Sequence, residues 1–144
     1  MAIELDQKQG LIAGDGQLPV KMAQHAKENG FEVVAISLSG DNYKQLKKYC
    51  SRVYSVCPGE ALKIEWILKT EGIKQLTFLG KVSKTVVLKR PKFDAKAIEF
   101  IQKAMRLNDD KVMLMIIEEL EKIGITVLDQ TLFIKNLMIC RPVL

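Results

Sequence analysis

The stretch GLIAGDGQLP, residues 10–19, joins an apolar run to a helical pattern through a turn punctuated by glycine. The apolar run ends at Gly14, and we expect the chain to turn sharply through Asp15 and Gly16. Pro19 suits the first turn of a helix, because the N–H groups there have no intrahelical partners. The same free N–H groups, at the positive end of the helix dipole, suit an anion such as phosphate. A tight turn with a purely structural role is the alternative interpretation.

The pattern around this turn predicts a sheet covered by helices. Residues 8–14 read as a strand, residues 18–29 as a helix capped by Gly30, and residues 31–38 (FEVVAISL) as a second strand. An almost continuous apolar, β-branched run of this length is typical of a strand buried on both faces of a parallel sheet. Strand, helix and strand form a βαβ unit with a right-handed crossover. We therefore predict an α/β fold with three layers, in which helices flank a mostly parallel sheet.

The remaining sequence continues the alternation of helices and strands. We expect helices over residues 43–50, 60–71, 94–106, 108–123 and 130–139, and strands over residues 52–56, 75–79 and 125–128. Residues 82–93 are basic and irregular, and we expect them to cover the sheet edge or to contact a partner. The strand over 75–79 ends in Gly80-Lys81, so two strand ends finish in glycine turns. Because ligands of an open parallel sheet lie outside the carboxyl ends of its strands, both turns are expected to face one crevice.

The composition excludes several classes of protein. The 144 residues are enough for one domain with a sizeable core, and no apolar run approaches the ~20 residues of a membrane-spanning helix. The first residues are mixed and acidic, which excludes a recognisable signal peptide. The net charge of +5 suits a nucleic acid, an anionic membrane surface or a phosphorylated ligand. Only 6% of the residues are aromatic, so the stacking pattern of single-strand binders is missing and we expect no nucleic-acid partner.

The sequence offers no convincing catalytic group. Cys50, Cys57 and Cys140 have neither metal-ligand spacing nor the even count of a disulfide framework, so we expect reduced, packed thiols and a cytoplasmic location. The single histidine, His25, falls inside the first helix, away from the strand ends, where no Ser–His–Asp set can form. The Asp109-Asp110 pair is expected to cap a helix rather than to bind Mg²⁺. We assign neither a catalytic residue nor a metal ligand.

Three segments of the chain match, in order and spacing, segments of one known family. They are residues 10–19, residues 68–73 with 79–82 (LKTEGI and LGKV), and residues 108–110 with 120–124 (NDD and LEKIG). Together they resemble the N-terminal domain of the LpxI-type UDP-2,3-diacylglucosamine pyrophosphatases. Residues 130–134 fall where the first domain of that family gives way to the second.

The resemblance implies an enzyme of lipid A biosynthesis in Gram-negative bacteria. Such enzymes hydrolyse UDP-2,3-diacylglucosamine to UMP and 2,3-diacylglucosamine 1-phosphate with a divalent metal, here Mg²⁺. The family has two domains with the lipid held between them, and its catalytic aspartate lies in the C-terminal domain. Residues 1–139 would form the Rossmann-like N-terminal domain, and residues 140–144 a tail or the start of a linker to a C-terminal catalytic domain absent from this chain. Such a domain is expected to be inactive alone.

The resemblance also makes this domain one wall of a substrate cleft. The phosphate-sugar or nucleotide end of the UDP-activated diacylated glucosamine, and of its lipid product, would contact the two glycine turns, with acyl chains along apolar helix faces. An exposed cleft wall favours self-association, so we expect a homodimer. The location implied is the cytoplasm, with peripheral attachment at the inner membrane face as a variant. The expected substrate-binding residues are Gly14, Asp15, Gly16, Gln17, Leu18, Pro19, Gly80, Lys81 and Val82.

Two alternatives stay open at this point. One is a stand-alone nucleotide-binding or regulatory module without catalysis, for which Asp41 is the available ribose ligand after the second strand. The other is a basic domain that docks on a partner protein or an anionic membrane through residues 84–92.

Overall fold

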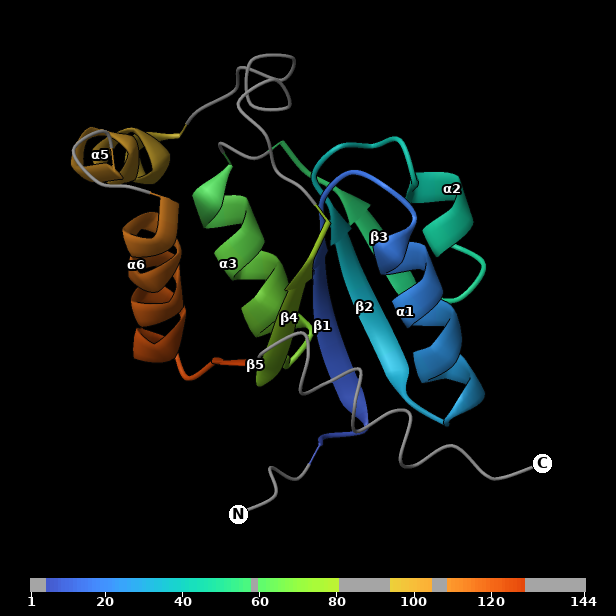
Figure 1. The fold of residues 1–144 in the computed structure, drawn as a ribbon. Helices are drawn as coiled ribbons and strands as arrows, with labels where there is room; N and C mark the ends of the chain where they lie inside the picture. The colour runs from blue at the N-terminus through green and yellow to red at the C-terminus, as the bar shows by residue number, and fades with distance from the viewer. Residues whose placement is uncertain (1–4, 58–59, 81–93, 105–108, 129–144) are drawn as a thin grey trace.

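Five parallel strands form the sheet at the centre of the structure, in the order β3-β2-β1-β4-β5 (Figure 1). The computed structural model describes residues 5–57, 60–80, 94–104 and 109–128 of the chain. The strands are β1 (Lys8–Ala13), β2 (Glu32–Ser37), β3 (Arg52–Ser55), β4 (Gln75–Leu79) and β5 (Thr126–Leu128). The central strands are buried on both faces, as the apolar runs of the sequence predict for a parallel sheet.

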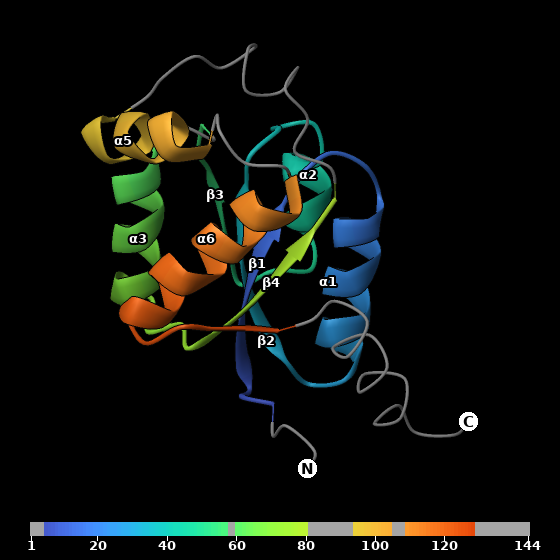
Figure 2. The ribbon, with the colours of Figure 1, turned by 60° about the vertical axis from the view of Figure 1, so that its left-hand side comes forward.

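Helices cover both faces of the sheet and complete a three-layer, Rossmann-like α/β domain (Figures 1 and 2). One face carries α1 and α2, the other carries α3 and α6, and α5 lies across the start of α3. The helices are α1 (Leu18–Glu28), α2 (Tyr43–Leu46), α3 (Ala61–Thr70), α5 (Ala95–Ala104) and α6 (Asp109–Lys122). Among the described helices, none has the length and apolar character needed to cross a membrane.

The sheet divides the core into two apolar clusters. Successive side chains of a strand point to opposite faces, so Leu11 packs on the α1 side and Ile12 on the α3 side. The cluster on the α1 side comprises Leu11, Ala13, Val20, Met22, Ala23, Ala26, Val33, Ala35, Leu46, Leu79 and Leu128. The cluster on the α3 side comprises Ile12, Val34, Ile36, Leu38, Val56, Ile67, Leu68, Ile73, Leu76 and Ile125. This two-sided burial explains why the strands read as continuous apolar runs rather than alternating ones.

The element boundaries expected from the sequence are confirmed to within a few residues, with one larger difference. The helix expected over residues 43–50 ends at Leu46, and the chain continues in turns. The N–H of Lys48 donates to the carbonyl of Gln45 at 3.2 Å, and that of Tyr49 to Leu46 at 3.0 Å, which are the tighter bonds of a closing helix end. The helix expected over residues 130–139 and the irregular stretch over residues 82–93 lie outside the described residues.

The strand order reverses at β1. From β1 the chain adds β2 and then β3 on one side, and it crosses back through α3 to place β4 and β5 on the other side. In open parallel sheets, ligands bind outside the carboxyl ends of the strands where the order reverses. The carboxyl ends of β1 and β4, at the top of Figure 1, are therefore the place to examine for a site.

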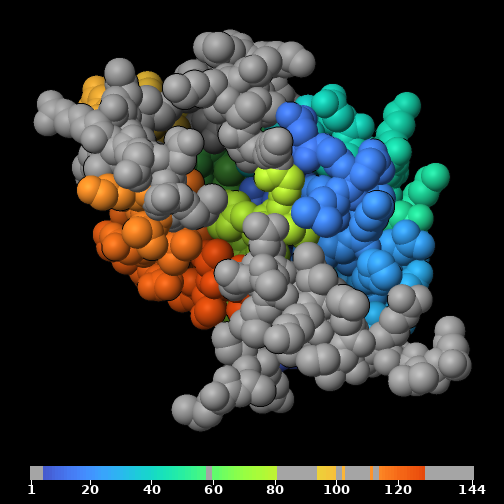
Figure 3. All heavy atoms as spheres, in the orientation of Figure 1, coloured from blue at the N-terminus to red at the C-terminus, as the bar shows by residue number. Residues whose placement is uncertain are grey.

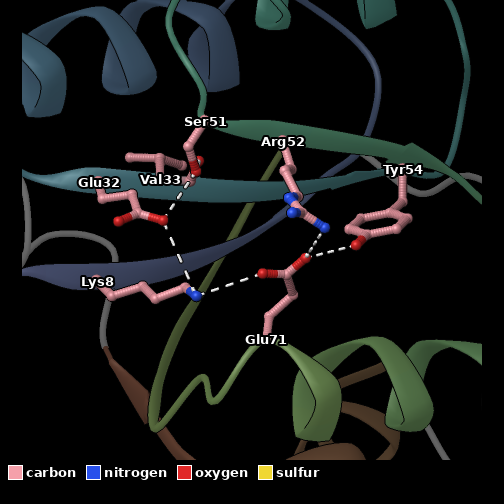
Figure 4. A network of polar contacts seen from close by, with 7 residues as sticks. All are labelled: Lys8, Glu32, Val33, Ser51, Arg52, Tyr54 and Glu71. Atoms are coloured by element: carbon pink, nitrogen blue, oxygen red, sulfur yellow. Dashed lines mark hydrogen bonds and ion pairs between the residues drawn. The ribbon is translucent and has the colours of Figure 1, made fainter.

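A polar network fastens α3 to the opposite, amino edge of the sheet (Figure 4). The Glu71 carboxylate, at the end of α3, accepts a hydrogen bond from the Tyr54 hydroxyl of β3. Lys8 of β1 lies 3.3 Å from one Glu71 oxygen, and Arg52 of β3 lies 3.4 Å from the other. Lys8 and Arg52 are the first residues of their strands, so this network lies away from the glycine turns and serves the fold.

Candidate functional site

The two glycine turns lie in contact at the reversal of strand order. The N–H of Gly14, which follows β1, donates to the carbonyl oxygen of Leu79 at the end of β4, at 2.8 Å. Gly80 has a φ of +87°, and a Cβ added there would lie 2.7 Å from the Asp15 carbonyl oxygen and 2.9 Å from the Gly14 carbonyl carbon. Only glycine fits so close to the neighbouring backbone. The two turns thus lie at one edge of the sheet, as expected, and a shared crevice and a role in binding stay predictions.

The start of α1 is open at this same edge. Gln17 precedes the helix without a side-chain cap, and the first turn of α1 carries no acidic residue. Gly16 has a φ of +100°, and no atom of the described residues lies within 4 Å of an added Cβ there, so these residues leave the space beside it open. The first N–H groups of a helix need partners from outside it, and none of the described side chains caps them. This arrangement is suited to an anionic group.

The predicted site residues divide into a buried frame and an exposed rim. Gly14 and Pro19 are buried, Asp15 is half-buried, and Gly16, Gln17, Leu18 and Gly80 are exposed. Leu18 leaves 46% of its surface accessible, which places an apolar side chain beside the helix start. Figure 3 shows atoms of β4, in yellow-green, at the surface between α6 in orange and α1 in blue. Lys81 and Val82 lie outside the described residues.

A third loop joins the site, and sequence reasoning missed the residues that bring it there. The loop after β2 holds Asn42, whose side-chain amide donates to the carbonyl oxygens of Gly14 at 2.9 Å and Gly16 at 3.0 Å. Ser37, the last residue of β2, donates its hydroxyl to the Asn42 side-chain oxygen at 3.2 Å. Both side chains are buried. An asparagine just before a helix gives no sequence signal for such a contact, because asparagine is common at helix starts for local reasons.

The described cysteines and the single histidine, which the sequence did not favour as catalytic groups, lie in the places that the sequence predicts. Burial raises the pKa of the Cys50 thiol to about 12, and Cys57 is buried, so both are packed thiols. The His25 side chain is exposed on α1, and its Nδ1 lies 3.9 Å from the Glu28 carboxylate of the same helix. Cys140 lies outside the described residues. Within the part of the chain that the structure describes, no Ser–His–Asp or Cys–His arrangement forms.

The described residues form no cluster of side chains that could enclose a metal ion. Nowhere among residues 5–57, 60–80, 94–104 and 109–128 do three or more His, Cys, Asp or Glu residues gather as metal ligands would. Mg²⁺ is held by carboxylates together with water or substrate phosphates. Asp109 and Asp110 begin α6, as expected for helix-starting residues.

Comparison with known sequences decides the family. The family model described as the LpxI N-terminal domain matches residues 8–137, which is most of the chain. This chain belongs to the LpxI family. Both glycine turns, the Asn42 loop and every described element of the LpxI-type sheet lie within the matched range. The resemblance carried by the three sequence segments is thereby confirmed.

The similarity to a curated LpxI protein extends over most of this chain. The UDP-2,3-diacylglucosamine pyrophosphatase LpxI of Caulobacter vibrioides is 32% identical to this chain over 125 residues. The aligned part covers 81% of this chain and 42% of that LpxI protein. The chain thus corresponds to less than half the length of this relative.

Proposed function

We propose that this LpxI-type domain forms one wall of the substrate site of a UDP-2,3-diacylglucosamine pyrophosphatase in lipid A biosynthesis. The two glycine turns bind the nucleotide or phosphate-sugar end of UDP-2,3-diacylglucosamine. The observation that carries this proposal is the contact between Gly14 and the end of β4, directly beside the uncapped start of α1. We take the substrate from the name of the Caulobacter vibrioides relative, a UDP-2,3-diacylglucosamine pyrophosphatase.

The proposed substrate is a UDP-linked sugar. Its diphosphate is an anion, and the start of an α-helix offers N–H donors and the positive end of a dipole. The site lies at the reversal of strand order, where parallel sheets bind their ligands. Lys81, one residue past Gly80, would add a positive point charge to this edge. The acyl chains of the substrate would then lie against apolar helix surface such as the exposed Leu18.

The hydrolysis itself is proposed for a two-domain protein in which this domain would be joined to a C-terminal catalytic domain. Its products would be UMP and 2,3-diacylglucosamine 1-phosphate. The family resemblance implies a divalent metal and a catalytic aspartate in the C-terminal domain, and no residue of this chain is assigned a step of the reaction. The domain alone is expected to bind without hydrolysing. A cytoplasmic location, peripheral attachment at the inner membrane face and a homodimer belong to the same proposal.

Thermal unfolding with added ligands tests the binding part. A ligand that binds only the folded chain stabilises it by about 2.7 kcal/mol at a concentration 100 times its Kd, which raises Tm by several degrees. We expect UMP, a UDP-sugar or the lipid product to raise Tm. Unchanged Tm with all three would contradict the proposal. A rise with ATP or NAD but not with uridine nucleotides would favour the stand-alone nucleotide module, with Asp41 as ribose ligand.

A matched pair of glycine variants locates the site. Gly16 and Gly30 stand at opposite ends of α1, both have positive φ, and both have open space around an added Cβ. Gly16→Ala and Gly30→Ala should therefore cost similar stability without ligand. Only Gly16→Ala is expected to lose the ligand-induced rise in Tm, because only Gly16 adjoins the proposed site. Equal rises in both variants would place binding elsewhere.

A further inference from the structure

The Asn42 side chain is fixed from both of its ends. Its Nδ2 donates to the carbonyl oxygens of Gly14 and Gly16, and its Oδ1 accepts the hydroxyl hydrogen of Ser37. Ser37 Oγ in turn accepts from the N–H of Gly40 at 3.2 Å, which closes the loop after β2. Asn42 is 1% exposed, so these bonds do not compete with solvent. The amide therefore has one orientation, with its donor side facing the first glycine turn.

Asn42 makes these contacts instead of a local one. It occupies the N-cap position of α2, yet its side chain makes no capping hydrogen bond to that helix. Asparagine is among the preferred N-cap residues, and such a cap contributes about 1 kcal/mol. Its two acceptors are 28 and 26 residues away in the sequence. Asn42 thus binds the Gly14 and Gly16 carbonyls rather than capping α2, which indicates that the orientation of these carbonyls matters.

The orientation of the carbonyls decides where the N–H groups point. Peptide groups are planar and trans, so the N–H of Asp15 points opposite to the Gly14 carbonyl, and that of Gln17 opposite to the Gly16 carbonyl. Asn42 follows β2, on one side of β1, and β4 lies on the other side. The N–H groups of Asp15 and Gln17 therefore point away from the Asn42 side of the turn. The Gly14 and Gly16 carbonyl oxygens, which would repel an anion, are held by the Asn42 amide.

We propose that Asn42 is a positioning residue that holds the first glycine turn in the orientation that receives a phosphate group. Asn42 does not touch the ligand in this proposal; it acts by binding the Gly14 and Gly16 carbonyls. The inference rests on the proposed function, because it concerns the same site and the same phosphate-bearing class of ligand. The proposal adds a residue from the loop after β2 to a site that the sequence predicted from the two glycine turns alone.

Substitution of Asn42 tests the inference with UMP as the probe. Asn42→Asp keeps the shape of the side chain and can still accept from Ser37, but it turns a carboxylate oxygen toward the Gly14 and Gly16 carbonyls. We expect the Kd for UMP, measured by calorimetry, to rise at least tenfold in Asn42→Asp and in Asn42→Ala. Inorganic phosphate is titrated in parallel: equal loss for both ligands assigns the effect to the phosphate group, and loss for UMP alone would overturn the phosphate assignment.

Asn29 provides the matched control. Its Nδ2 donates to the His25 carbonyl oxygen at 2.7 Å, at the far end of α1. Asn29→Asp removes the same kind of hydrogen bond, and we expect its Kd for UMP to equal that of the unaltered chain. Wild-type affinity in a folded Asn42→Asp or Asn42→Ala variant would overturn the inference and leave the proposed function standing. No binding of UMP by the unaltered chain would overturn both.

A measurement on the unaltered chain covers the case in which the Asn42 variants do not fold. In ¹H–¹⁵N NMR spectra we expect the Asn42 side-chain amide protons to exchange slowly with solvent, because they are buried and bonded. Addition of UMP should shift the backbone amide signals of Asp15 and Gln17. Fast exchange at Asn42, or binding of UMP that leaves both backbone signals in place, would overturn the inference.

Discussion

The Tyr54 hydroxyl donates a hydrogen bond to the Glu71 carboxylate and so joins the edge strand β3 to the end of α3 (Figure 4). The Glu71 side chain is only 8% exposed, and Lys8 and Arg52 contact its two oxygens. The hydrogen bond from Tyr54 lowers the pKa of Glu71 below its usual value; Lys8 and Arg52 act in the same direction, and burial opposes them. The network thus stabilises the charged carboxylate, which makes its contribution to folding dependent on pH.

Glu71→Gln is expected to destabilise the chain at pH 7 by about 1.5–3 kcal/mol, the range for hydrogen bonds to a charged group. A lowered folded-state pKa means that this stability is present above the unfolded value, near 4.5, and is lost as pH falls through the folded-state pKa. The difference between wild type and variant should therefore shrink below pH 4.5. Urea unfolding at several pH values measures it.

Glu119 serves as the control for Glu71. It pairs with Lys122 at 3.1 Å on the surface of α6, and its side chain is 44% exposed. Exposed pairs of this kind contribute about 0–1 kcal/mol, so Glu119→Gln should change stability little at any pH. An equal loss in the two variants would contradict the role given to the Glu71 network.

Asp94 is expected to contribute to the start of two helices at once. Its Oδ1 accepts from the N–H of Ala97 in α5, and its Oδ2 accepts from the N–H of Leu62 in α3, both at 2.8 Å. Since one lost cap costs about 1 kcal/mol, Asp94→Ala should cost about 2 kcal/mol, and Asp94→Asn, with one acceptor oxygen, less. Thermal and denaturant unfolding give the values. A cost for Asp94→Ala no greater than that of the exposed Asp41→Ala would refute double capping.

Gly80→Ala is expected to be more damaging than Gly16→Ala. Both glycines have positive φ, which costs a non-glycine residue about 1–3 kcal/mol. At Gly80 the new methyl group would also meet the Asp15 carbonyl oxygen at 2.7 Å, whereas at Gly16 it would meet nothing within 4 Å. The clash adds about 1–3 kcal/mol if the turns move apart. Equal midpoints of unfolding for the two variants would show that the turns separate freely.

Thr77→Val is expected to stabilise the chain. Thr77 lies in β4 and is fully buried, and its Oγ1 has no hydrogen-bond partner among the residues that the structure describes. An unsatisfied buried hydroxyl costs about 1–3 kcal/mol, and valine has nearly the same shape, so a gain of about 1 kcal/mol is expected. Thr126→Val, at an exposed position of β5, is the control and should change stability by less than about 0.5 kcal/mol. Destabilisation by Thr77→Val would mean that the hydroxyl is satisfied in solution.

Asp15→Asn is expected to tighten the binding of UMP. Asp15 carries the one negative side chain of the first glycine turn, and a unit charge about 7 Å from a phosphate in water opposes binding by about 0.6 kcal/mol. Its removal should lower the Kd by about threefold at low salt and by less at high salt, where the charges are screened. Calorimetry in the presence of EDTA makes the comparison without a bridging cation. A weaker affinity in Asp15→Asn would contradict the repulsion of the phosphate by the Asp15 carboxylate.

Local patterns in the sequence were enough to predict the layers of this fold. The apolar run over residues 31–38 predicts a strand buried on both faces, and Gly30 marks the end of the helix before it; both features are present. Gly14 and Gly80 follow strands of one parallel sheet, which predicts that they share an edge, and they are in contact. These predictions succeed because periodic burial and turn chemistry act over a few neighbouring residues.

The sequence by itself thus determined the elements, the parallel sheet and the edge that carries the candidate site. The tertiary structure decided which residues meet there: Asn42 reaches Gly14 and Gly16, and Glu71 gathers Lys8, Arg52 and Tyr54 from two strands. These contacts follow from the strand order β3-β2-β1-β4-β5, and an alternation of strands and helices is compatible with several orders. A single polar side chain carries no periodicity, so its distant partner is set only once the strands are in place.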